Sequence, residues 1–190
     1  TVARFYTPSG RCIQKPYDKN YNYDIFERYA HGEMTSADSM KVDTTDVYYT
    51  VRGRRVYGGG GIIPDAFVPI DTTKATDFYI KANRKATAMR FASSMFDKYK
   101  TALSDIDDFD KLSSWLDSIG LEKQFLEYAA KTDGIKPSDV EWEKTRVYML
   151  PQLKALTGRF SKLEEEAFYR FYLPIDDVIQ KALASPSYVE

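Results

Sequence analysis

The sequence predicts an α+β protein in which short β-hairpins occupy residues 1–73 and an all-helical region occupies residues 74–190. Two observations lead to this prediction. Up to about residue 70, short β-type runs alternate with turn sequences that contain Pro and Gly. From about Thr76 onward, the apolar residues recur at helical spacing. The chain has 190 residues, 43% apolar and 29% charged, which is the composition of a globular protein with a core.

Two hairpins are expected in the β-rich part. Residues 1–15 are interpreted as strand, turn and strand, because Pro8 presets φ in the turn and Gly10 suits the last position of a type I turn. Runs at 48–51 and 54–57 flank Arg52 and Gly53, which predict a two-residue hairpin turn. Residues 16–46 are interpreted as an insertion with a short helix at about 24–29. No internal repeat is recognised.

One long helix is expected to follow from about Thr76. Its apolar residues fall on one side of a helix, and they are Ile80, Ala82, Ala86, Met89, Ala92, Phe96 and Leu103.

Further helices make about five or six in the C-terminal region. A helix in 109–120 is expected to stop at Gly120, and one in 121–134 at Gly134. Ser138 and Glu141 form a capping-box pattern that begins a fourth helix. Because Pro151 interrupts that helix, a kink or a split is expected near Leu150. Two more helices are expected at about 162–172 and 175–184, on either side of Pro174.

Charge and composition exclude several classes of function. The formal net charge of −1 and the pI near 5.9 give no overall field that would draw the chain to nucleic acid or to an anionic membrane. No apolar run approaches the roughly 20 residues of a membrane span, and residues 1–20 have no signal-peptide pattern. A single cysteine, Cys12, excludes an internal disulfide framework. Because the chain starts without Met and directly in a strand-like run, we expect an internal or C-terminal piece.

Four consecutive glycines at 58–61 raise the question of a phosphate-binding loop. Such a loop needs a helix N-terminus and a Gly-Lys-Ser/Thr or spaced-glycine pattern, but Ile62, Ile63 and Pro64 follow and favour extended backbone. The glycines are therefore interpreted as a corner where the chain packs too closely for a Cβ atom. Asp65 is expected to hydrogen-bond to this turn.

Other candidate sites have simpler structural explanations. Arg52, Arg54 and Arg55 near tyrosines could contact nucleic acid, but solvated hairpin arginines are favoured. The acidic run 105–110 resembles a calcium loop, yet it has Phe109 at a ligand position and no turn glycine, so capping and solvation are favoured.

No catalytic set can be assembled from the residues themselves. His31 is the only imidazole, and no nucleophile elbow accompanies it. Ser9 is interpreted as a turn residue, and Cys12 as a packed strand residue. The sequence thus assigns no catalytic, cofactor-binding or metal-binding residue.

Two blocks of sequence carry a resemblance to a known family. TVARFYTPSGRCIQKPY at 1–17 and VYYTVRGRRVYGGGGIIPDAFVP at 47–69 resemble the last β portion of the carboxyl-terminal processing, or tail-specific, serine peptidases. The matching residues are Tyr6, Thr7, Pro8, Ser9, Gly10, Arg11, Ile13 and Gln14, and then Gly60, Gly61, Ile62, Pro64 and Asp65. The resemblance covers about a third of the chain. It assigns residues 1–73 to the peptidase core and leaves residues 74–190 as a helical C-terminal domain.

The resemblance implies a serine endopeptidase whose catalytic residues lie upstream of this chain. In that family a serine attacks the peptide bond and a neutral lysine accepts its proton, and neither motif occurs in residues 1–190. The chain is therefore expected to be inactive alone, with polypeptide substrates bound by the parent enzyme through an upstream PDZ module. Membership also implies a periplasmic or cell-envelope location.

Two other functions remain open. The helical region is the basis of an alternative, a non-enzymatic interaction module in which the aromatic run FYRFYLP at 168–174 supplies anchors. Self-association through the helical domain is a further expectation. Nucleic-acid binding through the hairpin arginines would instead predict an affinity that falls steeply with salt.

Overall fold

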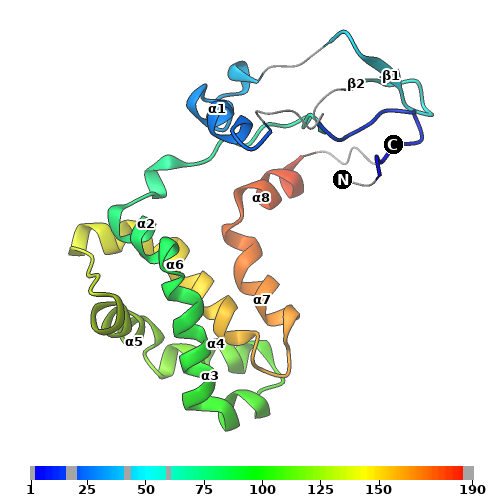
Figure 1. Ribbon diagram of the computed structural model, residues 1–190. Coiled ribbons are helices and arrows are strands. Elements are labelled where there is room, and N and C mark those ends of the chain that lie inside the picture. The colour runs from blue at the N-terminus through cyan, green and yellow to red at the C-terminus, as the bar shows by residue number, and fades with distance from the viewer. Residues whose placement is uncertain (1–2, 16–20, 41–43, 59–60, 186–190) are drawn as a thin grey trace. The chain divides into compact units, whose positions relative to one another are not determined.

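The computed structural model describes residues 3–15, 21–40, 44–58 and 61–185. The chain is a mixed α and β protein, mostly helical, and divides into two compact units, Thr1–Ile70 and Asp71–Glu190 (Figure 1). The predicted division at 73/74 lies three residues from this boundary.

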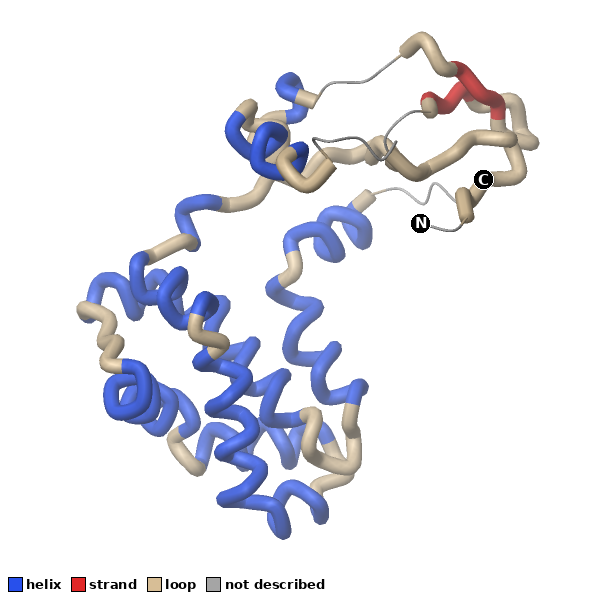
Figure 2. Tube along the Cα trace, viewed as in Figure 1, coloured by secondary structure: helices blue, strands red, loops and turns tan. Residues whose placement is uncertain are grey.

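The first unit contains little regular secondary structure. Its elements are α1 (Asp24–Ala30), the 3-10 turn η1 (Ala37–Ser39), β1 (Val47–Tyr49) and β2 (Arg55–Tyr57). The two strands form an antiparallel sheet, the only one in the described residues, in which Tyr48 is paired with Val56 (Figure 2). The predicted short helix is thus confirmed as α1.

The tip of the first hairpin is a three-residue loop. The N–H of Gly10 donates to the carbonyl of Thr7 at 2.8 Å, and the N–H of Thr7 donates to the carbonyl of Arg11 at 2.9 Å. Gly10 has a φ of 80°, so a left-handed residue follows a type I turn. Beyond the loop, one antiparallel bridge joins Tyr6 to Cys12.

The second hairpin has the same tip. The N–H of Gly53 donates to the carbonyl of Thr50 at 2.8 Å, the N–H of Thr50 donates to the carbonyl of Arg54 at 2.9 Å, and Gly53 also has a φ of 80°. The predicted two-residue turn of Arg52 and Gly53 is therefore wrong, because the loop has three residues. The two tips share the pattern Tyr-Thr-x-x-Gly-Arg, as YTPSGR and YTVRGR, a short repeat that was not recognised in the sequence.

The first unit has no apolar core in the residues that the structure describes. Only Glu33 and Gly58 are buried there, and no hydrophobic side chain is. Large apolar side chains lie in solvent instead, among them Phe5, Phe26 and Tyr49, each more than 60% exposed. An isolated two-stranded hairpin is marginally stable at best, so the described part of this unit has little apolar burial to stabilise it.

The second unit is helical. Its elements are η2 (Thr72–Lys74), α2 (Asp77–Arg84), α3 (Thr87–Asp105), α4 (Phe109–Ser118), α5 (Leu121–Tyr128), η3 (Ala129–Asp133), α6 (Asp139–Gly158), α7 (Glu165–Tyr172), η4 (Leu173–Ile175) and α8 (Asp177–Ala184). The described part of this unit thus has seven α-helices, one more than the upper end of the prediction.

The additional helix arises because the predicted long helix is broken. Ala86 has a φ of 50°, in the left-handed region, and it separates α2 from α3. The break changes which residues face inward: Ala82 and Ala92 are buried as predicted, but Ile80 is 37% and Met89 62% exposed. Ala86 is exposed as well, so one helical wheel drawn through both helices gave the wrong side for these three residues.

Most of the other predicted boundaries are confirmed. Gly120 and Gly134 end their helical segments with φ of 64° and 68°, and Ser138 begins α6 with the full capping box. A kink or a split was predicted near Leu150; the split is wrong, because α6 continues through Pro151. One feature was not predicted: the segment after α5 is a π-helix, η3.

The core of the helical unit is aromatic. Phe78, Phe91 and Phe125 are almost fully buried, and their rings make edge-to-face contacts with centroids 5.4 to 6.3 Å apart. Burial of a large apolar side chain contributes about 1.5–3 kcal/mol each. At the other end of α6, a Cβ atom on Gly158 would lie 3.3 Å from that of Ala167, so glycine allows α6 and α7 to approach closely.

Candidate functional site

The glycine run has a shaping role at the two positions that the structure describes. At Gly58 a Cβ atom would lie 2.5 Å from Oδ2 of Asp46 and 2.9 Å from a ring carbon of Tyr48. Gly61 has open space but a φ of 109°, which side chains rarely adopt. Close packing is thus confirmed at Gly58, although side chains rather than backbone fill the space. Gly59 and Gly60 lie outside the described residues.

The hairpin arginines do not form one free cationic patch. The guanidinium of Arg54 donates to the carboxylate of Asp65, and that of Arg55 lies 5.4 Å from the centre of the Tyr57 ring. A hydrogen bond from Asp65 to the glycine turn was predicted, but the carboxylate of Asp65 instead accepts from the side chain of Arg54. Arg11, from the first hairpin, donates to the carbonyl of Tyr57 at 3.1 Å.

The remaining polar candidates are in structural positions. In the acidic run, Asp108 accepts a hydrogen bond at 2.9 Å from the N–H of Lys111 and so caps α4, as predicted. Ser9 is in the first hairpin tip, hydrogen-bonded to the hydroxyl of Thr7 at 2.8 Å. Cys12 is half-buried in the bridge, and His31 is exposed after α1. Among the described residues, no three His, Cys, Asp or Glu side chains gather where they could hold a metal ion.

The aromatic run at 168–174 is mostly part of the core. Phe171 is 9% exposed and its ring centre lies 4.5 Å from that of Phe109. Phe168 stacks on Tyr172 with centroids 5.3 Å apart, and Tyr169 is 51% exposed. Packing thus accounts for Phe171, and Tyr169 is the most exposed aromatic of the run.

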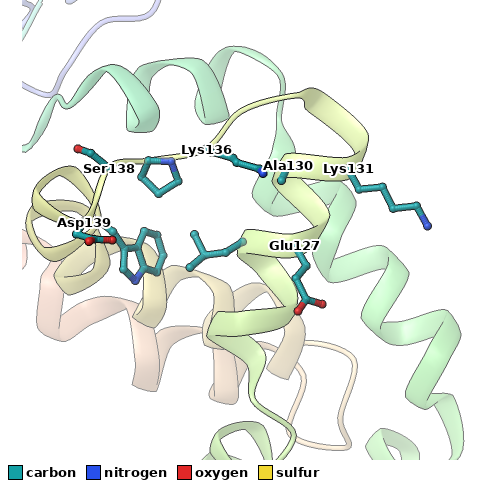
Figure 3. A pocket seen from close by; sticks show the side chains of 9 residues that line it. Glu127, Ala130, Lys131, Lys136, Ser138 and Asp139 are labelled. Atoms are coloured by element: carbon teal, nitrogen blue, oxygen red, sulfur yellow. The ribbon is translucent and has the colours of Figure 1, made fainter.

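A hollow of about 640 Å³ lies where α5, η3 and the start of α6 meet. Its apolar lining comes from Leu126, Ala130, Pro137 and Trp142. This volume is in the usual range for a ligand pocket. Figure 3 shows that Ser138 and Asp139 lie at one end of the hollow and Lys131 at the other, with Lys136 extending toward Ala130.

Two more hollows continue from the first along α6. The second, of about 460 Å³, shares Leu126 and Glu127 with the first, and the third, of about 490 Å³, shares Leu150 with the second. We call this series the α6 track. Between Ser138 at one end and Lys154 at the other, the helix rises by roughly 24 Å at about 1.5 Å per residue.

The π-helix in the wall of the first hollow is held by Asp133. Its carboxylate accepts hydrogen bonds from the hydroxyl of Thr87 at 2.6 Å and from Nη2 of Arg90 at 2.6 and 2.7 Å. These two donors lower the pKa of Asp133, with Thr87 making the larger contribution. Lys85 donates to the main-chain carbonyl of the same residue at 3.1 Å. The two residues on either side of Ala86 at the break between α2 and α3, Lys85 and Thr87, therefore both hydrogen-bond to Asp133.

The other end of the first hollow is fixed by the capping box of α6. The carboxylate of Glu141 accepts a hydrogen bond at 2.9 Å from the N–H of Ser138, which lowers the pKa of Glu141. The indole of Trp142 donates to Glu122 at 2.6 Å, so its polar atom is already satisfied. Trp142 itself is only 7% exposed, and its ring packs edge-to-face against Phe78, with centroids 5.9 Å apart.

The lining of the α6 track is mixed in character. The described residues around it include apolar side chains and charged groups, and no histidine or cysteine is among them. The sequence analysis missed the track because its walls come from four separate helices. The capping box and Pro151, both recognised in the sequence, each lie at one of its hollows.

Comparisons with known proteins give no relative: no protein-family model matches the chain, and neither a curated protein nor a solved structure does. Within the described residues, no helix combines the length and the apolar character needed to cross a membrane.

Proposed function

We propose that this chain is the C-terminal part of a tail-specific serine endopeptidase, with residues 1–73 completing the peptidase core. The catalytic serine and lysine belong to a preceding region, and this chain supplies scaffold. The assignment rests on the resemblance of the two hairpin blocks to that family. Polypeptide substrates and a periplasmic or envelope location follow from the same resemblance and are part of the proposal.

The structural observation that supports the proposal is that the first unit buries no apolar side chain in its described residues. Within the described residues, its hairpins also leave backbone hydrogen-bonding groups free. Because the N–H of Gly58 donates to the carbonyl of Asp46, the register turns the backbone groups of Val47 and Tyr49 to the outer edge of β1. Exposed aromatics and an unpaired edge are features of one part of a larger sheet.

The test is to read the coding sequence upstream of Thr1 and to express the longer protein. We expect a serine motif and then a lysine within one domain length, and cleavage of a polypeptide that stops when either residue is replaced by alanine. The present chain alone should show no hydrolysis above buffer. A start codon immediately before Thr1, or cleavage by residues 1–190 themselves, would contradict the proposal.

A further inference from the structure

The hydrophobic core of the helical unit ends before α8. In the described part of the chain, Tyr172, at the end of α7, is the last residue that packs against this core. No side chain of α8 is buried: Ile179 is half-buried, and Val178 and Leu183 are 60% and 75% exposed. Packing of an apolar face supplies most of the stability of a helix in a protein, so α8 receives little of it.

The short connection before α8 separates this helix from α7. Pro174 lies in η4, and Asp176 has a φ of −87° and a ψ of 105°, outside the helical region. The side chain of Asp176 accepts hydrogen bonds at 3.0 Å from two N–H groups in the first turn of α8, and Gln180 donates to the carbonyl of Leu173 at 2.9 Å. These bonds are local, so they do not fix α8 on the helices of the core.

One ion pair joins α8 to a residue that is distant in the chain. The ammonium group of Lys74, in η2, donates to the carboxylate of Asp177, the first residue of α8. Among the described residues, this is the only hydrogen bond or ion pair between α8 and an element other than η4. The ion pair therefore connects the last helix of the unit to its first turn.

Lys74 is itself held in place by residues outside α8. Its Nζ atom lies 4.1 Å from the centre of the Tyr148 ring, in α6, and 3.8 Å from the carboxylate of Asp71. Two residues further along the chain, the hydroxyl groups of Thr76 and Thr145 are hydrogen-bonded at 2.7 Å, and Thr145 is fully buried. The ammonium group is therefore positioned for Asp177 whether or not α8 is docked.

We propose that α8 is a latch that opens about η4 while the rest of the helical unit stays folded, and that the ion pair between Lys74 and Asp177 holds it closed. An isolated helix of eight residues is unstable in water, so α8 unfolds when it leaves the unit. Opening makes the backbone around Lys181 accessible to a protease. Because Asp177 is 53% exposed, salt weakens the pair and favours opening. This proposal concerns the helical unit alone and does not depend on the peptidase assignment.

Hydrogen exchange of the whole 190-residue chain, followed by mass spectrometry in low concentrations of urea, tests whether α8 opens by itself. We expect the amides of α8 to exchange at least about a hundredfold faster than those of α3, and more slowly than those of an unstructured peptide. Exchange in α8 should change little with urea, because opening the latch exposes little surface. Exchange in α3 should rise steeply, because it requires unfolding of the core.

Variants of the ion pair test what holds the latch closed. Lys74→Met removes the charge and keeps a long side chain, and it should speed exchange in α8 by about threefold or more. The matched control is Lys81→Met, which removes the same charge from an exposed pair with Asp77 inside α2 and should leave exchange in α8 unchanged. Lys74→Met combined with Asp177→Asn should exchange in α8 no faster than the faster single variant, because both substitutions break one contact.

Limited proteolysis of the same proteins gives a second measurement. Trypsin cuts after Lys181 when α8 is open, so the rate of this cut follows the population of the open form. The rate should rise by about threefold or more in Lys74→Met and stay at the native rate in Lys81→Met.

Four results would overturn the proposal. One is exchange in α8 that rises with urea as steeply as exchange in α3, since α8 would then open only with the whole unit. Another is exchange in α8 at the rate of an unstructured peptide, which would show that α8 is never closed. The third is the same exchange in α8 for Lys74→Met as for Lys81→Met. The fourth is full additivity of the two single variants of the ion pair, which would show that their effects are independent.

Discussion

Thr87, the first residue of α3, donates a hydrogen bond of 2.6 Å to the carboxylate of Asp133, the last residue of the π-helix. Thr87 is fully buried, and the carboxylate of Asp133 is 6% exposed. The contact joins two irregular parts of the helical unit, the left-handed break before α3 and the π-helix after α5. Each irregular part therefore depends on the other.

The first prediction concerns this contact. Asp133→Ala leaves the Thr87 hydroxyl buried without a partner and removes the charge opposite Arg90, so we expect a loss of about 2–3 kcal/mol in the free energy of unfolding. Urea unfolding followed by tryptophan fluorescence measures it, because both tryptophans, Trp115 and Trp142, lie in the helical unit. Asp97→Ala, at an exposed position of the same α3, is the control and should change little.

The second prediction is a dependence on pH. The pKa of Asp133 is lowered in the folded state, so its stabilisation is fully present above the unfolded carboxyl pKa of about 3.9. It is lost as pH falls through the lower, folded value. We therefore compare the free energy of unfolding of the native protein and of Asp133→Asn as a function of pH. The difference between the two proteins should be constant near neutral pH and should shrink as the pH falls below about 3.9. Parallel curves down to the acid end would show that the carboxylate contributes no such linkage.

The third prediction concerns the close approach of α6 and α7 at Gly158. A Cβ atom there would lie 3.2 Å from Cδ2 of Leu112 and 3.3 Å from Cβ of Ala167. Gly158→Val should lower the free energy of unfolding by about 2–3 kcal/mol through overpacking. Gly158→Ala should cost less, because alanine gains about 1 kcal/mol in helix propensity. A valine variant as stable as the native protein would show that the helices separate easily.

The fourth prediction uses the two matching hairpin tips. Gly10 and Gly53 both have a φ of 80° and open space around them, so Gly→Ala adds backbone strain of about 1 kcal/mol without a clash. Each variant should speed hydrogen exchange at the amide of its own Thr7 or Thr50. Asparagine, which adopts the left-handed region more readily, should have a smaller effect at either site. Equal effects of alanine and asparagine would exclude strain as the cause.

The fifth prediction separates the two units by hydrogen exchange on the whole chain. Amides in α3 and α6, which pack around a buried core, should exchange about a thousandfold more slowly than those of β1 and β2. In the longer protein of the proposed function, the β1 amides of Val47 and Tyr49 should become protected. Strong protection of β1 in the present chain would show that the first unit is stable by itself.

Local sequence patterns predicted much of the helical unit. The stops at Gly120 and Gly134 and the capping box at Ser138 depend on a few neighbouring residues, and all three are observed. These features were predictable because glycine and serine act on the backbone next to them.

Features that depend on distant residues were not predictable in this way. The break at Ala86 is stabilised by contacts with Asp133, which is 47 residues away in the chain, and a continuous apolar spacing hid it. The α6 track likewise requires α4, α5 and α7 beside α6. The second hairpin loop differs: its match to the first, YTPSGR and YTVRGR, was present in the sequence and gives the correct loop length.

The free side of β1 has a consequence for handling the protein. Unpaired strand edges promote aggregation when they are long and flat, but β1 has only three residues and follows Asp46. On the opposite side of the sheet, Arg11 covers the carbonyl of Tyr57. A second protein molecule that pairs with the edge of β1 can form only a few hydrogen bonds with these three residues. Concentrated solutions of residues 1–190 should therefore resist fibril growth, although several aromatic side chains are exposed.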